Sequence, residues 1–148
     1  MIGRGTMTTS NKTKAKVFEF INDEILAGRG DLVLPGSDEL SGVIKRYLEG
    51  GENKMHCHPT EDHTFYILQG AASFRIDSDD NVLEVGELEA VYLPKGTNYW
   101  FHSAGDKKLV MLRVGTEQGS DRIIDGELVK SHRTGETAQH APVRELPF

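Results

Sequence analysis

Short runs of apolar, β-branched and aromatic residues alternate with turn residues through the middle of the chain. This pattern predicts eight strands, over residues 43–49, 53–58, 63–69, 71–77, 82–85, 90–94, 98–103 and 108–114. Glycine, proline, asparagine and aspartate separate the runs, at spacings typical of all-β folds. No interval is long enough for a crossover helix, so we expect antiparallel sheets arranged as a sandwich or barrel.

The segments on either side of this region have different patterns. The apolar residues from Lys16 to Leu26 fall at helical spacing and predict a short N-terminal helix, with a strand as the alternative. Residues 1–16 have few residues to bury and are expected to form a flexible leader. Residues 116–148 are mostly polar and predict an extended C-terminal arm or tail, which leaves the barrel domain at 17–115.

Composition and charge narrow the class of protein further. A chain of 148 residues with 37% hydrophobic residues is the size of one domain with its own core. Its net charge of -6 repels phosphate backbones and argues against a nucleic-acid partner. Its apolar runs are far shorter than the roughly 20 residues that cross a bilayer, so no membrane span is expected. One cysteine and no signal-like segment favour a cytoplasmic location.

Three closely spaced histidines are the strongest chemical signal. His56 and His58 are two residues apart, so they share one face of an extended strand, while Cys57 points to the other face. Pro59 ends that strand, and the following turn returns the chain to His63. Three imidazoles with open coordination positions are typical of a catalytic metal site. The alternative is that these histidines are surface or core residues bonded to nearby carboxylates.

Two acidic residues lie within the turn of this cluster. Glu61 or Asp62 would either bind the metal directly or hold an imidazole through its other ring nitrogen, and the sequence does not separate these roles. Cys57 is expected to be a small buried residue rather than a ligand.

The segment from Gly50 to Gly70 resembles the first motif of the cupin superfamily. In that motif a glycine, five residues, His-x-His, three or four residues, a glutamate, six residues and a second glycine follow one another. Here His56 and His58 occupy the His-x-His positions, and His63 stands where the family has glutamate. The resemblance implies a cupin-type β-barrel or jelly roll and a metal bound by His56, His58 and His63.

The second cupin motif is similar but lacks its histidine. Gly86 and Pro94-Lys95-Gly96 match the motif, and Tyr99 stands at the position of the family's fourth ligand. Strand alternation puts Tyr99 and Phe101 on one face. The resemblance of the preceding turn to the cupin turn that delivers the fourth ligand implies that Tyr99 lies inside, where it is expected to act as a ligand, as a general acid or base, or as packing. His102 would lie on the opposite face unless a bulge turns it inward.

The resemblance covers about half of the chain and implies a range of functions. The leading expectation is a metal-binding cupin, with Fe, Mn, Ni or Zn, that acts on a small organic molecule, with dioxygenase chemistry favoured. The alternatives are a non-catalytic ligand-binding module and a structural cupin whose metal site has decayed. A homodimer is expected from the family. Arg46, Arg75 and Arg113 are candidates to bind a substrate carboxylate, because the guanidinium fork matches carboxylate geometry.

Overall fold

The computed structural model describes residues 14–21, 30–47, 50–51, 54–116, 121–130 and 139–148. This part of the chain contains strands and no helix, and hence no helix that could span a membrane. The strands are β1 (Lys16–Phe18), β2 (Gly30–Val33), β3 (Ser41–Tyr47), β4 (Gly50–Gly51), β5 (His63–Gln69), β6 (Ala72–Ile76), β7 (Val82–Val85), β8 (Ala90–Leu93), β9 (Tyr99–Ser103), β10 (Leu109–Gly115), β11 (Arg122–Ile124), β12 (Glu127–Val129), β13 (Gln139–His140) and β14 (Val143–Glu145).

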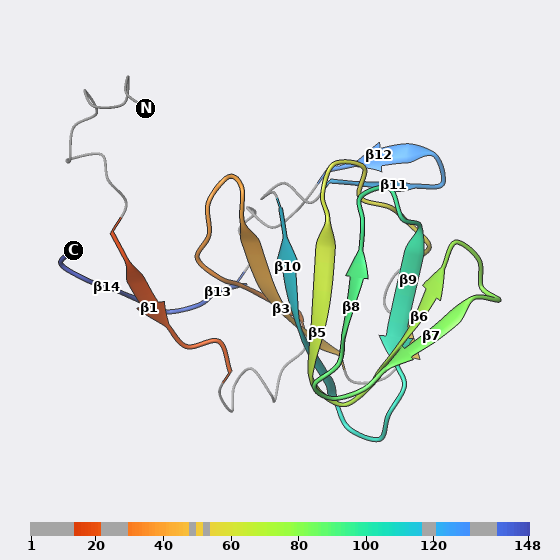
Figure 1. Cartoon of the computed structure of the whole chain (residues 1–148), viewed down its shortest axis with the longest axis horizontal. Helices are drawn as coiled ribbons and strands as arrows, with labels where there is room; N and C mark the ends of the chain where they lie inside the picture. Colours follow the sequence, from red (N-terminus) through yellow and green to blue (C-terminus); the bar gives the residue numbers. More distant parts are fainter. Residues whose placement is uncertain (1–13, 22–29, 48–49, 52–53, 117–120, 131–138) are drawn as a thin grey trace.

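Two sheets form the body of the molecule (Figure 1). The larger sheet has six strands in the order β13-β2-β3-β10-β5-β8, and the smaller has four in the order β4-β9-β6-β7. Each sheet keeps its own edges, so the barrel is not closed. The β11–β12 hairpin lies at one end of the two sheets, and β1 pairs with β14 beside the larger sheet (Figure 1).

The space between the two sheets is filled by an aromatic and aliphatic core. On β5 the alternation places His63, Phe65 and Ile67 inward, as expected, and leaves Tyr66 45% exposed on the outer face. Phe65 packs against Phe74 of β6, with ring centroids 5.3 Å apart. This contact between the two sheets fixes β5 against the core, and it thereby fixes the position of His63 two residues before Phe65.

A second apolar cluster covers the outer face of the larger sheet. Its buried members are Leu32, Leu34, Ile44, Val110 and Ala141, and Phe18, Leu68 and Leu112 pack against them. Phe18 belongs to β1 and Ala141 lies between β13 and β14, so both terminal segments contribute to this cover. The larger sheet is therefore buried on both faces along β3 and β10.

A glycine ends β5, at the last position of the first cupin-like motif. Gly70 has a φ of +80°, a backbone conformation that side chains rarely adopt. A Cβ atom there would lie 2.8 Å from the carbonyl oxygen of Lys108. The turn from β5 to β6 thus requires glycine for both its conformation and its close contact with the neighbouring backbone.

Most of the predicted strands are confirmed, with three corrections. The predicted helix from Lys16 is wrong over the described residues, since Val17 and Phe18 form β1 opposite β14; positions 22–26 lie outside the described residues. Val and Phe suit an extended strand, and the terminal partner supplies the hydrogen bonds that a helix would make internally. The run at 53–58 makes isolated bridges rather than a strand, and β13 pairs with β2 in parallel, against the antiparallel expectation.

Candidate metal centre

Two isolated bridges hold the His56–His58 segment at the end of the barrel. His56 exchanges backbone hydrogen bonds with Tyr99, at 3.0 and 2.8 Å. Cys57 exchanges backbone bonds with Ile123, at 3.1 and 2.8 Å. The segment therefore lies between β9 and the β11–β12 hairpin. Because adjacent residues point to opposite sides, Cys57 faces Ile123 while both histidines face the barrel.

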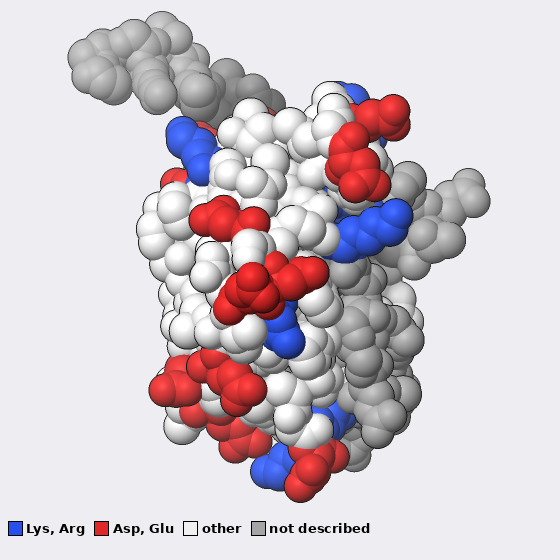
Figure 2. Space-filling view, turned by 90° about the vertical axis from the view of Figure 1, so that its right-hand side faces the viewer, with Lys and Arg blue, Asp and Glu red and all other residues white. Residues whose placement is uncertain are grey.

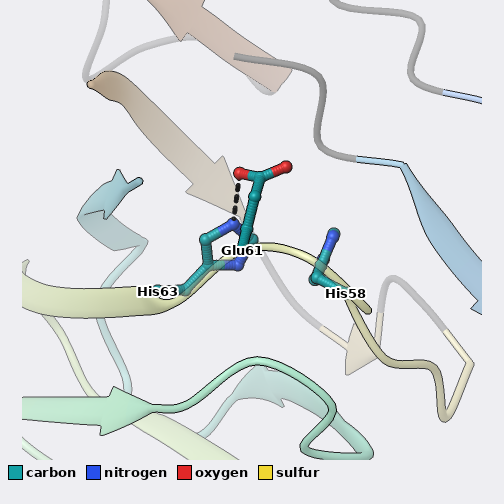
Figure 3. A group of neighbouring side chains, drawn as sticks. All are labelled: His58, Glu61 and His63. Carbon is teal, nitrogen blue, oxygen red and sulfur yellow. Dashed lines mark hydrogen bonds and ion pairs between the residues drawn. The ribbon is translucent and has the colours of Figure 1, made fainter. Parts of the chain in front are cut away.

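The side chains of His58, Glu61 and His63 converge (Figure 3). One ligand atom from each residue lies within 4.8 Å of the others. All three residues are buried, and Glu61 and His63 keep only 1% and 2% of their surface exposed. His63 Nε2 and Glu61 Oε1 are 2.9 Å apart, the contact drawn as a dashed line in Figure 3. A short loop and the first residue of β5 thus supply a donor set of two imidazoles and one carboxylate.

Backbone carbonyl groups fix the ring nitrogens of His56 and His58. His56 Nδ1 lies 2.7 Å from the carbonyl oxygen of Lys54, and His58 Nδ1 lies 3.0 Å from that of Asp121. A carbonyl oxygen only accepts, so Nδ1 must carry the proton in each ring. The neutral ring then has its lone pair on Nε2, which leaves that nitrogen free to bind a metal.

His56 and Tyr99 lie beside the converging group. The ring centroid of His56 is 5.1 Å from that of His58 and 4.6 Å from that of Tyr99. Tyr99 is 3% exposed and belongs to the core with Phe101, so its inward orientation is confirmed. The structure thus brings all four sequence-predicted site residues to one end of the barrel, while the tightest group contains Glu61 instead of His56.

Two other candidates from the sequence, Asp62 and His102, make contacts that support the fold. Asp62 Oδ1 accepts a 2.8 Å hydrogen bond from the backbone N–H of Lys95, and so holds the turn that precedes β9. His102 alternates with the buried Phe101 and lies against Trp100 on the outer face of the smaller sheet, with ring centroids 5.6 Å apart. Neither residue belongs to the converging group in the described part of the chain.

A narrow pocket opens onto the centre. Its lining atoms lie so close together that they leave essentially no room for a water molecule. Its walls are His58, Glu61, His63, Leu93, Pro94, Thr97 and Tyr99. The walls opposite the ligands are mostly apolar, so a group entering this space would leave most of its water behind.

A glycine and a buried arginine lie behind the centre on β10. Gly115 pairs with His63, and a Cβ atom on it would lie 2.9 Å from His63 Cδ2, 3.0 Å from Glu61 Oε1 and 2.8 Å from Ser41 Oγ. Arg113, two residues earlier on the same inner face, is 1% exposed. The centre is therefore packed directly against the backbone of β10.

The structure shows which of the three arginines proposed from the sequence face the core and which face outward. Arg113 faces inward, as described above. Arg46 shares the outer face with Ile44 and bonds to Gly30 and Gln139. Arg75 lies 5.4 Å from the ring centroid of Trp100, on the outer face of the smaller sheet. Strand alternation alone did not show which arginine faces inward, because the face that a strand turns to the core depends on its pairing with the neighbouring strand.

Burial and nearby cations keep the imidazoles neutral. The pKa of His58 is lowered to about 2, first by burial and then by the charges of His63, His56 and Arg113. Burial also lowers the pKa of His56, and the charges of Arg122 and Lys45 lower it further. Neutral imidazole is the form that binds metals, so both rings are ready to act as ligands at neutral pH.

Comparisons with known proteins agree with this fold. The family model described as "Cupin domain" matches residues 43–115. No curated protein sequence matches this chain.

Solved structures with a similar fold include proteins of several kinds. An oxalate decarboxylase from Lactobacillus farciminis, solved as a formate complex, has a TM-score of 0.52 and 20% identity over 58% of this chain and 26% of its own. A Bacillus halodurans protein has a TM-score of 0.56 and 20% identity over 67% and 81% of the two chains. A cupin domain from Schizosaccharomyces pombe has a TM-score of 0.51 and 12% identity over 60% and 64%. At such identities the likeness shows the fold alone, and this chain spans about a quarter of the length of the oxalate decarboxylases.

Acidification is expected to destabilise the metal-free protein. The folded-state pKa of His58 and of His56 lies below the ordinary value of 6.5, so the unfolded chain binds more protons below that pH. Stability should therefore fall as the pH drops from 7.5 to 5.5, by up to about 1.4 kcal/mol per pH unit for each histidine.

Denaturant unfolding at several pH values, with a chelator present, measures this dependence. His58→Asn keeps a side-chain N–H near the Asp121 carbonyl and removes the titrating ring, so it should reduce the slope by about one proton. An unchanged slope in this variant would contradict the buried, neutral state of His58.

Gly115→Ala is expected to disturb the centre from behind. Alanine normally suits a strand better than glycine, but here its methyl group would overlap Ser41, His63 and Glu61. We expect a loss of about 1–3 kcal/mol in the free energy of unfolding, as for overpacked cores.

Gly86→Ala is the matched control, because the nearest atom to its new Cβ would be 3.4 Å away, in ordinary contact. Equal stability of the two variants, measured by denaturant unfolding, would show that β10 does not pack against the centre as described.

Proposed function

This chain belongs to the cupin superfamily, and on that premise we propose that it is a metal-dependent oxidoreductase acting on a small organic molecule. His58, Glu61 and His63 are the proposed ligands, and His56 beside them is a proposed further ligand. The observation that carries the proposal is the convergence of these three buried donors within 4.8 Å. Burying polar and charged groups of this kind costs folding free energy unless a bound partner or a hydrogen-bond network satisfies them.

The donor set fits a first-row transition metal. Two imidazoles and one carboxylate with open positions form the ligand set of non-haem Fe(II) oxygenases, which favours iron over Mn, Ni and Zn. Iron bound there would supply the activation of dioxygen. The protein's own contribution is to hold the rings in the correct tautomer through Lys54 and Asp121, and to limit water through Leu93 and Pro94.

Tyr99 is the proposed acid or base of the reaction. It lines the same pocket as His58, Glu61 and His63, and its position after the Pro94–Gly96 turn corresponds to the family's fourth ligand. A phenol in its neutral form carries a proton on its oxygen, so Tyr99 would act first as a proton donor. Its role is to donate a proton to a substrate oxygen in the pocket.

A second candidate is a structural cupin without metal. The 2.9 Å contact between His63 and Glu61 already pairs two buried polar groups, and the pocket is narrow. In this case the centre would be a polar network that stabilises one packing of the barrel. A non-catalytic module that binds a small ligand is the remaining alternative.

Metal content separates these candidates. Protein purified without an affinity tag should contain about one iron per chain, whereas Glu61→Gln and His58→Asn should lose it. Replacing residues that only support metal ligands costs about 10- to 100-fold in affinity, so loss of a ligand should cost at least that much.

His102→Asn is the control, since it changes a histidine on the outer face. Elemental analysis makes the measurement. A metal-free wild-type protein that also fails to take up added Fe, Mn, Ni or Zn would contradict the proposal and favour the structural candidate.

Tyr99→Phe distinguishes a proton donor from a ligand or packing residue. If Tyr99 donates a proton, the variant should keep its iron and lose about 10²- to 10⁴-fold in turnover. Dioxygen uptake with diketones, thiols and phenols is the assay. Loss of the iron would identify Tyr99 as a ligand, and unchanged turnover would reduce it to core packing.

The homodimer stays a prediction. Supporting it, the terminal segments expose apolar side chains, among them Val17, Phe20, Val143 and Phe148. Surfaces of this kind commonly mark an interface between subunits.

A further inference from the structure

We propose that the β11–β12 hairpin, with Asp121 and Lys130 at its base, positions His58 as a metal ligand and controls how fast the centre exchanges its metal. This inference rests on the proposed metal centre and adds a means of controlling it. The hairpin lies outside residues 43–115, which the family model matches, so the match to the family does not account for it.

The hairpin is a unit with its own internal structure. A two-residue turn, Asp125-Gly126, joins β11 to β12. Both turn residues have a positive φ, 52° and 81°, as a type I′ hairpin turn requires. At the other end, Lys130 Nζ lies 3.2 Å from Asp121 Oδ2. The turn and this ion pair close the hairpin at both ends, so it can separate from the body of the molecule without losing its own pairing.

The hairpin is attached to the segment that carries His58. Cys57 and Ile123 exchange two backbone hydrogen bonds, at 3.1 and 2.8 Å. The carbonyl oxygen of Asp121 accepts a 3.0 Å hydrogen bond from His58 Nδ1. The strands β11 and β12 form a sheet of their own, and none of the ten described residues from Asp121 to Lys130 is buried. A segment with few buried groups separates at a lower cost in free energy than the core does.

The orientation of the His58 ring depends on this attachment. The backbone of His58 is held separately, because the N–H group of Gly96 donates a 2.9 Å hydrogen bond to its carbonyl oxygen. The ring itself has the Asp121 carbonyl as the acceptor for its Nδ1 proton. While the hairpin is attached, this bond holds the ring in one orientation and leaves the lone pair on Nε2. When the hairpin separates, the ring loses this acceptor and can change rotamer.

The two other ligands are held more firmly. His63 is the first residue of β5 and pairs with Gly115 of β10, and a Cβ atom on Gly115 would lie 3.0 Å from Glu61 Oε1. His63 and Glu61 are therefore packed against the β10 backbone. The pocket leaves essentially no room for a water molecule, so water cannot displace a ligand until one of the three has moved. His58 is the ligand that can move first.

Attraction of cations to the surface does not limit this exchange. The whole chain has a net charge of -6. On the face over the smaller sheet, Asp and Glu side chains form several groups with fewer Lys and Arg among them (Figure 2). Such a surface raises the local concentration of divalent cations. The step that limits uptake and release is therefore the separation of the hairpin from the His58 segment.

A disulfide between the hairpin and the His58 segment tests the proposal. Cys57 is the only cysteine of the chain, so Ile123→Cys gives it one possible partner. Residues that exchange both backbone bonds in an antiparallel pair have Cα atoms about 5.5 Å apart, which suits a disulfide. Release of zinc, a redox-silent substitute for iron, to a chromophoric chelator is measured before and after reduction with a phosphine. We expect the oxidised form to release zinc at least about 10-fold more slowly, because its hairpin cannot separate.

The double variant Cys57→Ser with Ile123→Cys is the matched control. It carries the same hairpin substitution and cannot form the disulfide within the chain. Its release rate should match that of the reduced single variant and should not change on oxidation. Both proteins should hold one zinc per chain, since Cys57 faces Ile123 and not the centre. Equal release rates from the oxidised and reduced forms of Ile123→Cys would overturn the proposal.

Amide hydrogen exchange is a second test, and it needs neither a metal nor a variant. The N–H groups of Cys57 and Ile123 each donate to the other residue, so both exchange when the hairpin separates. We expect equal protection factors for the two, at least about 10-fold below that of Met111 in β10. Protection equal to that of Met111 would mean that the hairpin separates only on global unfolding. That result would overturn the proposal, and it decides the question if Ile123→Cys does not fold or does not form the disulfide.

The outcomes distinguish this inference from the proposed function. If the wild type binds zinc and either test gives the contrary result, the role of the hairpin is overturned and the metal centre stands. If the wild type binds no metal, the proposed function is overturned, and control of metal exchange with it.

Discussion

The burial of charge beside the histidines is the constraint on which the rest of this structure depends. Glu61 and Arg113 are each 1% exposed and His63 is 2% exposed, although charged groups lose several kcal/mol of solvation when they leave water. They are tolerated because β10 holds them together: Gly115 admits His63 and Glu61 against its backbone, and Arg113 follows on the same inner face. A one-residue slip of β10 would turn Arg113 outward and leave the carboxylate facing a different set of groups. The register of the larger sheet therefore determines which groups meet at the centre.

The buried cluster also differs in charge from the chain as a whole. The net charge of -6 belongs to the whole chain, whereas Lys45 and Arg113 lie on the inner face of the larger sheet. Burial makes these inner charges effective, because solvent screens them less than it screens charges on the surface. The rings of His56 and His58 remain neutral in this environment, and the carbonyl groups that hold their Nδ1 atoms leave Nε2 as the donor. The neutral state of both rings is thus a consequence of these buried surroundings.

The sequence predicted the strands and the place of the site better than it predicted the ligand set. Strands at 63–69 and 82–85 were predicted to the residue, because alternation and turn residues are local signals. The terminal strands were missed or assigned to a helix, because β1 exists only through its pairing with β14, about 125 residues away in the chain. Glu61 was left open between ligand and support, and only the folded loop shows its carboxylate beside His63. The bridge between Cys57 and Ile123 carried no signal in the sequence, since it joins two segments that are distant in the chain.

The central claim is that His58, Glu61 and His63 hold a transition metal, and a crystal structure of the metal-loaded protein tests it most directly. Anomalous scattering recorded at the absorption edge of the bound metal locates the ion without assumptions about the model. The account predicts a single strong peak at about 2.0–2.2 Å from one nitrogen of His58, one nitrogen of His63 and one oxygen of Glu61. No peak at this centre, with the 2.9 Å contact between His63 and Glu61 intact in crystals grown with excess metal, would contradict it.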